Sequence, residues 1–301
     1  MKKIIINIKM WLAFLLFFII LLIIIVCYTD GFRYMYLNYN DIYELDREYK
    51  YKKRIYNCVI SLTTTPNRLQ QIKHTLLSLL DSSVAVEEIR LNIPYYSCKG
   101  VKYRIPEWLK KLKSVKICRT IKDWGPATKL LPTLSHAKNK NTKIIVVDDD
   151  VIYGYYMVET LNDCFEKYDR KVAMTIYGDE IDKNNEMKYD IVTRAGNYIT
   201  GETYTDVLRG HSAYMLTPKM FTNDIYEYEK VPKECFFVDD NYFSFHLKKN
   251  GVKIMMIGMS YKAVPLPDMV NCFTDGLHRN ENTNGNNELV VNKYFNKKTK
   301  K

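Results

Sequence analysis

The sequence has 301 residues, of which 47% are hydrophobic, and a formal net charge of +11. This length and composition suit one domain of ordinary to large size with a packed core, and they exclude a chain that is disordered throughout. The seven cysteines stand singly and no two lie at the spacing of metal ligands, so neither a cysteine metal site nor a disulfide framework is indicated.

The N-terminal segment has the composition of a membrane anchor. No charged residue occurs between Met10 and Cys27, and this length suits a bilayer core about 30 Å thick. No small-residue cleavage site of a signal peptide follows it. Because Lys2, Lys3 and Lys9 precede the apolar run, the positive-inside rule predicts a single-pass type II membrane protein. We therefore expect a cytoplasmic tail over 1–9 and a transmembrane signal anchor over 10–28.

The basic excess collects at the ends of the chain. Five lysines between 293 and 301 form a tail with no acid near it, which is typical of a solvated segment. No nucleic-acid-binding motif accompanies this charge, so we expect no nucleic-acid partner. A basic body also suits an anionic substrate such as a nucleotide sugar, although net charge alone does not identify one.

Residues 29–55 have no clear period and are interpreted as a stem, so the globular pattern begins at Tyr56. Beyond it, short β-branched runs alternate with stretches whose apolar residues recur at helical spacing. This alternation predicts an α/β fold with a mixed, mostly parallel sheet flanked by helices, in a domain over 56–270. Strands are expected at 57–62, 89–93, 115–118, 144–147 and 172–176, and helices at 66–81, 108–113, from the turn at 123–126 to about 138, and at 157–168.

The last third of this domain is less regular. Residues 178–210 are polar and weakly patterned, which is typical of a binding loop or lid. A strand is expected at 211–216, a short helix opening at Pro218, a helix from Asp239 to the stop at Asn250-Gly251, and a final strand at 252–257. Residues 271–301 are interpreted as a C-terminal loop and basic tail.

Three consecutive aspartates follow the apolar run 144–147 directly. In α/β sheets, ligands bind beyond the carboxyl ends of the strands, where Asp148, Asp149 and Asp150 would project. Carboxylates one residue apart can hold a hard divalent cation, and that cation can hold a diphosphate. The alternative is a solvated acidic turn. The position directly after a buried strand favours the metal site.

A second acidic pair stands at the start of a predicted helix, about ninety residues further along the chain. Acids at a helix N-terminus are stabilised by its dipole and by its free N–H groups, so capping is the structural explanation for Asp239. Asp240 would face the crevice that holds the metal and act as a general base. Of two adjacent acids at a helix start, one can cap the helix while the other faces the crevice, and the residues alone leave open which of them is the base.

Together these segments resemble the metal-dependent glycosyltransferases of the GT-A fold, in the nucleotide-diphospho-sugar transferase superfamily. The last matching segment is similar to the Glu-Asp-Val-Tyr-type motif of inverting members, with Asp239 in place of Glu and Asn241 in place of an apolar residue. The resemblance covers roughly residues 56–257 and rests on the order and spacing of five segments: Val59-Ile60-Ser61-Leu62-Thr63-Thr64-Thr65-Pro66-Asn67-Arg68, Asp123-Trp124-Gly125-Pro126-Ala127-Thr128-Lys129, Asp148-Asp149-Asp150, Gly210-His211-Ser212, and Asp239-Asp240-Asn241-Tyr242-Phe243-Ser244.

The resemblance implies a Rossmann-like GT-A domain that transfers a hexosyl or related group from a nucleoside-diphosphate sugar, with a UDP-sugar as the expected donor. The acceptor would be a hydroxyl of a glycan, a protein or a lipid. With Asp240 as base, the acceptor attacks the anomeric carbon from the face opposite the leaving group, and inversion follows. An anchor, a stem and a catalytic domain in this order also look like a Golgi-type enzyme, which implies an endomembrane of Golgi or ER type or a virus-associated membrane.

The resemblance also implies roles for individual residues. Mn²⁺ or Mg²⁺ would be held by Asp150, by Asp148 and by a histidine, which is His278 or alternatively His211. For Lys129, which would reach the base or a phosphate, a solvated helix lysine is the alternative. The residues expected beside the nucleotide are Thr63, Thr65, Arg68, Lys129, Asp148 and Asp149.

Two other functions are compatible with parts of this pattern. Asp148-x-Asp150 after an apolar strand is similar to the nucleophile motif of haloacid-dehalogenase-type phosphatases. That motif belongs on the first strand of its fold, whereas here about ninety residues of strand and helix precede it. A membrane-anchored binding or coat protein of the same fold is the non-enzymatic alternative, although the acids needed for catalysis are present.

Overall fold

The computed structural model describes residues 2–28, 31–181, 187–188, 202–231, 236–257 and 264–265. Contacts divide the chain into two units, residues 1–41 and residues 42–301. The first unit consists of the helices α1 (Lys2–Tyr28) and α2 (Gly31–Tyr39). The second unit contains the sheet and all the residues discussed below as a candidate site.

The apolar side chains described in α1 are exposed. Trp11 is 74% exposed and Phe14 is 67% exposed, and their apolar neighbours between Met10 and Ile23 are exposed as well. Within the described ranges, no helix was found that combines the length and the apolarity needed to span a membrane. The transmembrane anchor predicted over 10–28 is not confirmed.

The second unit begins earlier than the sequence indicated. Helix α3 (Ile42–Tyr49) lies within the predicted stem, yet it buries Ile42, Leu45, Asp46 and Tyr49. These positions follow the i, i+3, i+4, i+7 spacing of a helix that packs on a core, but an acid stands among them and weakens the pattern. Asp46 accepts hydrogen bonds from the backbone N–H groups of residues 113 and 114, at 2.9 and 2.8 Å. The predicted stem is therefore partly an element of the globular unit.

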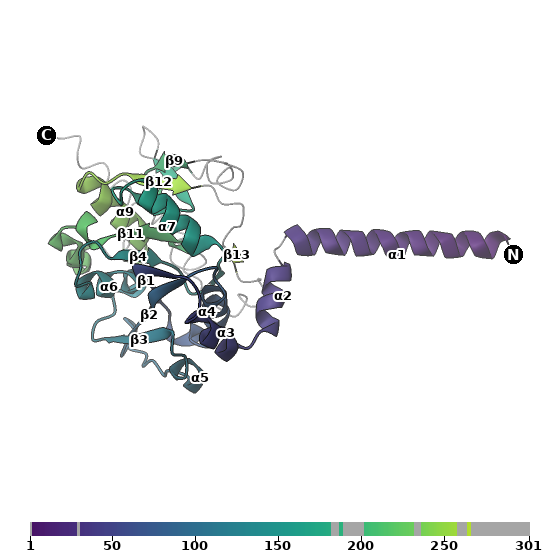
Figure 1. The fold of residues 1–301 in the computed structure, drawn as a ribbon, viewed down its shortest axis with the longest axis horizontal. Coiled ribbons are helices and arrows are strands. Elements are labelled where there is room, and N and C mark those ends of the chain that lie inside the picture. The colour runs from purple at the N-terminus through teal and green to yellow at the C-terminus, as the bar shows by residue number, and fades with distance from the viewer. Residues whose placement is uncertain are drawn as a thin grey trace. The chain divides into compact units, whose positions relative to one another are not determined.

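Eight strands form one mixed sheet in the order β3-β2-β1-β4-β11-β6-β12-β9, which runs from bottom to top in Figure 1. Pairing is parallel for β1 with β2 and with β4, for β2 with β3 and for β6 with β12. It is antiparallel on both sides of β11 and between β12 and β9. The predicted mixed, mostly parallel sheet is confirmed, with strands β1 (Arg54–Thr63), β2 (Ala85–Pro94), β3 (Val115–Thr120), β4 (Lys143–Val146), β6 (Ala173–Thr175), β9 (Glu202–Thr205), β11 (Tyr214–Leu216) and β12 (Ile254–Ile257).

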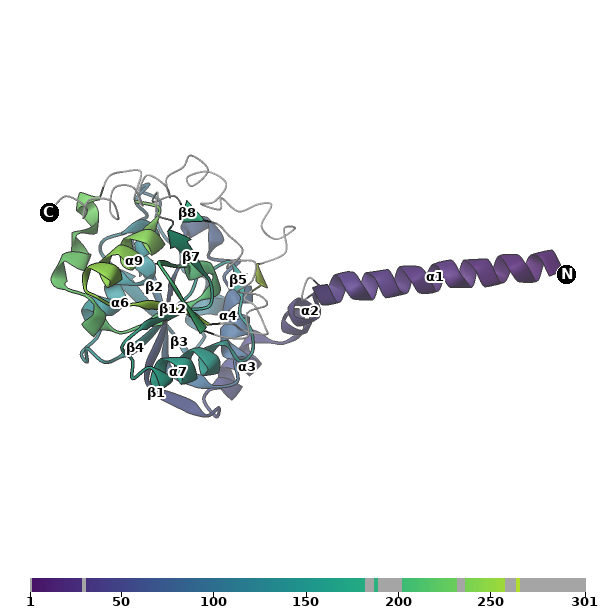
Figure 2. The ribbon, with the colours of Figure 1, turned by 90° about the horizontal axis from the view of Figure 1, so that it is seen from above.

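The helices expected between the strands are present but shorter than predicted. Pro132 stands in the first turn of α6 and so starts a new helix rather than kinking the preceding one. Figure 2 shows α6 and α9 on one side of the strands and α4 on the other. Besides α3, the helical elements that the structure describes in this unit are η1 (Pro66–Arg68), α4 (Lys73–Leu80), α5 (Glu107–Lys110), η2 (Gly125–Lys129), α6 (Leu131–His136), α7 (Met157–Lys167), η3 (Gly210–Ser212), η4 (Pro218–Met220), η5 (Asn223–Lys230) and α9 (Asp239–Lys249).

The stretch 178–210 is not one continuous loop. Its described parts contain β7 (Gly178–Ile181), β8 (Met187–Lys188), β9 and β10 (Val207–Leu208), and β10, β7 and β8 form a small separate sheet. The prediction of an unstructured loop is wrong for these residues, because strands of two to four residues are too short to show a period of two. A third sheet pairs β5 (Val151–Ile152) with β13 (Val264–Pro265).

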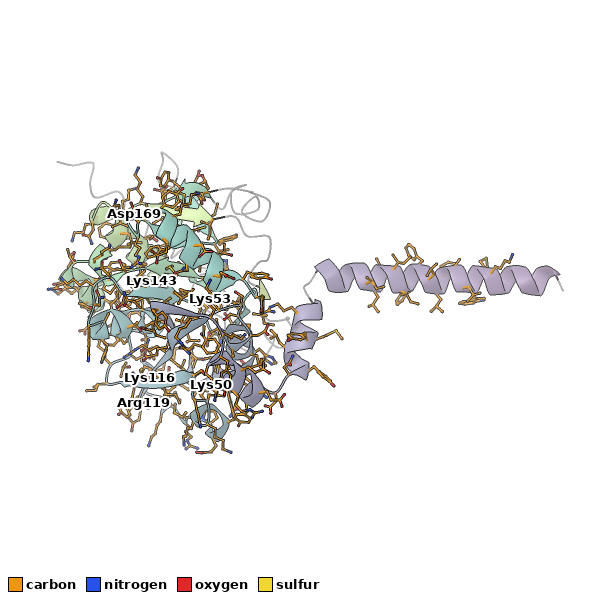
Figure 3. All side chains as sticks on the ribbon, in the orientation of Figure 1. Lys50, Lys53, Lys116, Arg119, Lys143 and Asp169 are labelled. Carbon is orange, nitrogen blue, oxygen red and sulfur yellow. The ribbon has the colours of Figure 1, made fainter. Side chains whose placement is uncertain are left out.

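The core of the second unit is centred on β4. Ile144, Ile145 and Val146 are completely buried, as expected for a strand covered by helices on both faces. At the start of the strand, the Lys143 ammonium donates to Asn162 Oδ1 at 2.7 Å and to Glu166 Oε1 at 2.9 Å, which joins β4 to α7 (Figure 3). The amino end of β4 is thereby joined to the helix that covers it.

We expect the protein to lose stability in mild acid because of His246 on α9. The side chain is only 6% exposed, and burial lowers its pKa to about 4, although Asp224 Oδ2 lies 3.8 Å from its Nδ1 and raises it. Between pH 6.5 and about 4 the unfolded chain therefore binds more protons, so the free energy of unfolding falls as the pH falls through this window.

His246→Gln should reduce this pH dependence by up to about 1.4 kcal/mol per pKa unit removed. The measurement is urea unfolding at about pH 7 and about pH 4.5, compared as free energies. His136→Gln, at an exposed position, is the matched control and should leave the pH dependence unchanged. Identical pH dependences for His246→Gln and the unmodified protein would contradict the prediction.

Candidate active site

The three aspartates after β4 form an ordered turn at the carboxyl edge of the sheet. The Asp148 backbone N–H donates to the Tyr153 hydroxyl at 2.8 Å, and the Thr75 hydroxyl donates to the Asp149 carbonyl at 2.8 Å. Asp149 is only 8% exposed, whereas the side chains of Asp148 and Asp150 are 27% and 28% exposed. The turn is therefore built into the core and is not a solvated loop.

Lys129, at the end of η2, brings the two acidic segments together. Its Nζ lies 2.9 Å from Asp148 Oδ1, 3.0 Å from Asp239 Oδ2 and 3.3 Å from Asp240 Oδ1, and its side chain is 5% exposed. We call these four residues the Lys129 cluster. The alternative of a solvated helix lysine is wrong, because Lys129 is buried among the acids, whereas its contact with a nucleotide stays a prediction.

Arg68, which follows the predicted Thr63–Thr65 loop, pairs with the other two aspartates. Its Nη2 lies 2.8 Å from Asp149 Oδ1 and 2.5 Å from Asp150 Oδ2. We call these three residues the Arg68 cluster. The three neighbouring aspartates of one turn are thus divided between two cationic side chains that come from different elements.

Burial and mutual repulsion shape the charge of both clusters. Burial raises the pKa of Asp149 to about 6 although Arg68 opposes the shift, and burial raises the pKa of Asp239 to about 7 against the pull of Lys129. Burial alone would lower the pKa of Lys129, but the attraction of Asp148, Asp239 and Asp240 outweighs it and raises this pKa well above its ordinary value. Lys129 is therefore a permanent cation.

The backbone of Gly210 also contacts the Lys129 cluster. Its backbone N–H donates to Asp240 Oδ2 at 2.9 Å. A Cβ at this position would lie 2.5 Å from Lys129 Nζ, 3.0 Å from Asp148 Oδ1 and 3.1 Å from Asp240 Oδ1, so any other residue would displace the ammonium. Glycine permits this close approach of the backbone to the ammonium and the two carboxylates.

A buried ion pair flanks this contact. Arg209 Nε donates to Asp179 Oδ2 of β7, which is 2% exposed, and Arg209 Nη1 donates to Asn241 Oδ1 of α9 at 3.2 Å. Arg209 precedes Gly210, and Asn241 follows Asp240. The hydrogen bond between Arg209 and Asn241 therefore holds together the two segments that form the Gly210–Asp240 hydrogen bond.

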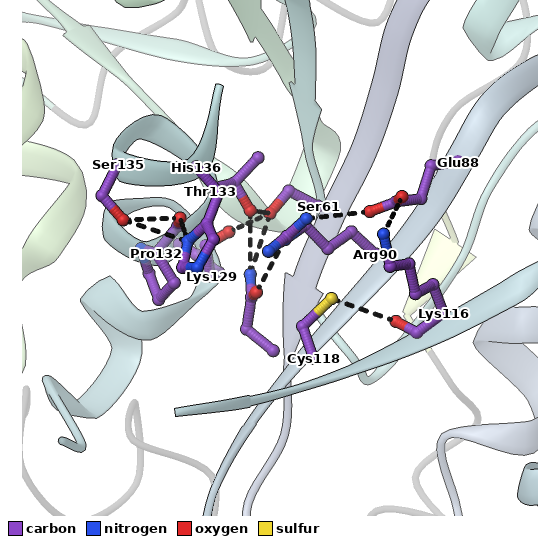
Figure 4. A network of polar contacts seen from close by, with 11 residues as sticks. Ser61, Glu88, Arg90, Lys116, Cys118, Lys129, Pro132, Thr133, Ser135 and His136 are labelled. Atoms are coloured by element: carbon purple, nitrogen blue, oxygen red, sulfur yellow. Dashed lines mark hydrogen bonds and ion pairs between the residues drawn. The ribbon is translucent and has the colours of Figure 1, made fainter. Parts of the chain in front are cut away.

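A polar network in the core fixes the backbone of Lys129 (Figure 4). Ser61 Oγ of β1 donates to the Lys129 carbonyl and lies 2.6 Å from Thr133 Oγ1 of α6. Asn92 Nδ2 of β2 donates to Ser61 Oγ at 3.1 Å and to Thr133 Oγ1 at 3.0 Å. All three side chains are buried. The sequence analysis missed these residues, and the only signal for them is a polar residue inside an otherwise apolar run.

The turn before η2 is also fixed by its own side chains. Asp123 Oδ1 accepts from the Gly125 N–H at 2.8 Å and from the Thr128 hydroxyl at 3.1 Å. Gly125 has φ +58°, and a Cβ there would lie 2.6 Å from the Phe236 ring. The predicted turn at 123–126 is confirmed as the element that delivers Lys129 to the acids.

The other predicted site residues differ in their positions. Thr63 donates its hydroxyl to the Asn92 carbonyl at 2.8 Å, and Thr65 is exposed. His211 lies near the Lys129 cluster: burial lowers its pKa, although the charges of Asp148 and Asp240 raise it, and its ring packs against Tyr177 with centroids 4.7 Å apart. His278 lies outside the described residues. Asp239 does not cap α9, because Val238 is the N-cap and, in the described structure, no side chain makes a cap hydrogen bond there.

In the described arrangement, Asp148 and Asp150 do not share one divalent metal ion. Asp148 and Asp150 are each at contact distance from a different cationic side chain, so a metal ion bound by both would have to displace Lys129 and Arg68. With Lys129 placed among the acids, the part of the chain that the structure describes contains no group of three or more histidine, cysteine and acidic side chains arranged to hold a metal. Because His278 lies outside the described residues, the predicted set of Asp148, Asp150 and a histidine stays a prediction.

No protein-family profile matches the sequence, and no curated protein does. Solved structures that resemble the chain include GalNAc-T7 with UDP, GalNAc and Mn²⁺ (13% identity, TM-score 0.48), a mannosyltransferase from Pyrobaculum calidifontis with GDP-Man and Mn²⁺ (12%, 0.48), and TarS 1–349 from S. aureus (12%, 0.41). Each match covers 70% of this chain but 43%, 57% and 59% of those chains, so this chain spans about half their length. At these identities and TM-scores, the likeness shows neither a family nor an activity for this chain.

Removing the Thr133 hydroxyl should destabilise the protein. Thr133→Val leaves Asn92 Nδ2 and Ser61 Oγ each without one buried partner, which costs about 1–3 kcal/mol for such groups. Thr133→Ser keeps the hydroxyl and should cost clearly less. Urea unfolding, read as the free energy of unfolding, compares the two variants. Equal losses for both would show that the methyl group and not the hydrogen bonds accounts for the stability.

Proposed function

We propose that this chain is a glycosyltransferase that moves a sugar from a nucleoside-diphosphate sugar to an acceptor hydroxyl, with inversion at the anomeric carbon and within a GT-A-type fold. The observation that carries the proposal is the convergence of Asp148 and Asp240. They are separated by more than ninety residues, yet both lie within 3.3 Å of one ammonium at the carboxyl edge of a mostly parallel sheet. That edge is where ligands bind in α/β folds.

Asp240 is the residue to which we assign the general base. Its side chain is 15% exposed, against 7% for Asp239, so it is the more accessible acid of the pair. One carboxylate oxygen is fixed by the Gly210 N–H, and the other has, within the described structure, no hydrogen-bond partner and depends on the Lys129 charge. A carboxylate held in this way can accept the proton of a hydroxyl that attacks the donor.

Arg68 is expected to face the diphosphate of the donor. Its guanidinium stays charged at all physiological pH values and presents donors in a fork that suits phosphate oxygens. The resemblance implies Mn²⁺ or Mg²⁺ as a cofactor, and we expect such an ion at Asp150, because Asp149 is buried and Asp148 is held by Lys129. No step assigned to the residues above depends on this ion.

The base assignment predicts different outcomes for the two neighbouring acids. Asp240→Asn keeps an acceptor for the Gly210 N–H but loses basicity, so transfer should slow at least about a hundredfold while donor binding changes little. Asp239→Asn, whose oxygen faces only Lys129, should keep most of the activity. Asp163→Asn, on the exposed face of α7, is the control.

The measurement is nucleoside-diphosphate release from a panel of UDP-sugars with and without acceptors, after thermal-shift assays have identified the donor that binds. Loss of transfer in Asp239→Asn with full activity in Asp240→Asn would reverse the assignment. Full activity in both would rule out the inverting mechanism. Cleavage of phosphate monoesters without a nucleotide would favour the phosphatase, and the absence of any turnover would favour a binding or coat protein.

Attachment to a membrane is a separate proposal that rests on residues 10–28. The exposed apolar side chains of α1 form a larger apolar surface than soluble proteins normally leave in water. We propose a type II orientation with the globular unit on the non-cytoplasmic side of an endomembrane or a virus-associated membrane, because the lysines precede the apolar run.

Deletion of residues 1–28 should abolish membrane association and leave the second unit folded, since that unit begins only at Ile42. Flotation with phosphatidylcholine vesicles measures the association, and circular dichroism checks the fold. If the shortened protein floats as well as the full chain, residues 10–28 are not the anchor.

A further inference from the structure

The Lys129 ammonium has the surroundings of a bound cation. The carboxylates of Asp148, Asp239 and Asp240 lie 2.9–3.3 Å from Nζ, which donates a hydrogen bond to Asp148 Oδ1 and forms ion pairs with the other two. The acids come from two segments, the turn after β4 and the start of α9. Their mutual repulsion in a buried place would separate them unless a cation stood between them.

Two of these carboxylate oxygens depend on Lys129 alone. Asp239 Oδ2 and Asp240 Oδ1 are buried and have no hydrogen-bond partner within the described structure. The same holds for the hydroxyl of Tyr214, which is completely buried and interacts electrostatically with Lys129 and the three acids. These oxygen atoms, which accept no hydrogen bond within the described structure, thus surround Lys129 Nζ.

The Gly210 backbone lies close to the ammonium, because a Cβ built at this position would be 2.5 Å from Nζ. The backbone of Lys129 cannot withdraw, because its carbonyl accepts from Ser61 Oγ in the buried network with Thr133. Lys129 is consequently fixed both at its backbone carbonyl and at its ammonium.

We propose that Lys129 is the resident cation of the acidic centre and occupies the position that a divalent ion would take between Asp148, Asp239 and Asp240. Hard divalent cations bind groups of carboxylate oxygens of this kind, so removal of the ammonium turns the cluster into a divalent-cation site. Lys129 is a positioning residue that gathers the acids, and Asp148 is not a metal ligand while it is present. This inference is independent of the proposed transfer reaction, since it concerns binding without a donor.

The test uses the full chain with Lys129→Ala and counts bound Mn²⁺ from the electron paramagnetic resonance signal of the free ion. The variant should bind one Mn²⁺ more per chain than the unmodified protein. In EDTA it should melt at a lower temperature, and Mn²⁺ about a hundredfold above its Kd should raise that Tm by at least about 5 °C more than it raises the Tm of the unmodified protein. The additional ion should disappear in Lys129→Ala/Asp148→Asn/Asp239→Asn, which keeps only one of the three carboxylates.

Lys116→Ala is the matched control. Lys116 also pairs with a carboxylate, Glu88, at 2.9 Å, but its side chain is 62% exposed, so its removal should create no Mn²⁺ site. If Lys129→Ala does not fold, Lys129→Ala/Asp240→Asn, with one carboxylate fewer to repel, is measured in the same way. Equal Mn²⁺ stoichiometry and equal Mn²⁺-induced shifts of Tm in the folded Lys129 variant and the unmodified protein would overturn the proposal.

Discussion

The ion pairs of one buried ammonium hold the acidic centre together. Lys129 links the turn after β4 to the N-terminus of α9 through its ion pairs with Asp148, Asp239 and Asp240. A buried charge is favourable only where its partners are close and fixed, and here they are fixed from several directions. The Ser61–Asn92–Thr133 network fixes the Lys129 backbone, and the Asp123 turn fixes the path of the chain into η2. The most polar site of the unit therefore depends on hydrogen bonds made deep within its sheet.

The segment that brings Gly210 to the acids contains backbone strain. Ala213 has φ +85°, a conformation that side chains other than glycine rarely adopt, and its N–H donates to the Gly210 carbonyl at 3.1 Å. Immediately afterwards, Tyr214 pairs with Val146 and Thr175 in the sheet. The chain must leave the acids and enter a central antiparallel strand within three residues, and the unusual conformation of Ala213 makes that change of direction possible. Strain of this kind persists only where the surrounding structure determines it.

Much of the fold could be predicted from the sequence, because strands and helices long enough to show a period follow local rules. The β-branched runs at 57–62 and 144–147 became β1 and β4, and the helix stop at Asn250-Gly251 is where α9 ends. The two-residue strand β10 shows no period, and α3 was hidden because a buried acid interrupts its apolar face. These elements are defined by contacts with distant residues rather than by their own patterns.

The local part of the site could also be predicted from the sequence, but its long-range contacts could not. That the two acidic segments lie at element ends follows from their neighbours in the sequence, whereas their partners do not. Lys129 has the local sequence of a helix lysine, and only the fold shows that three acids surround it. Asp239 was expected to cap α9, but an ammonium at 3.0 Å competes better for a carboxylate than free backbone N–H groups do. Long-range electrostatics overrode the local preference.

The charge of this centre constrains any anionic ligand that binds to it. The Lys129 and Arg68 clusters contain five carboxylates and two cationic side chains, which leaves a formal charge of −3 when all are ionised. A diphosphate would be repelled by such a centre, although the chain as a whole carries +11. Burial raises the pKa of Asp149 to about 6 and that of Asp239 to about 7, so proton uptake removes part of this charge near neutral pH. The remainder has to be compensated by cations that arrive with the ligand or by a rearrangement that frees the Arg68 guanidinium from its two aspartates. Of the two clusters, the Arg68 cluster is the one that can change on binding, because Asp150 is partly exposed while Lys129 is closed in by Gly210.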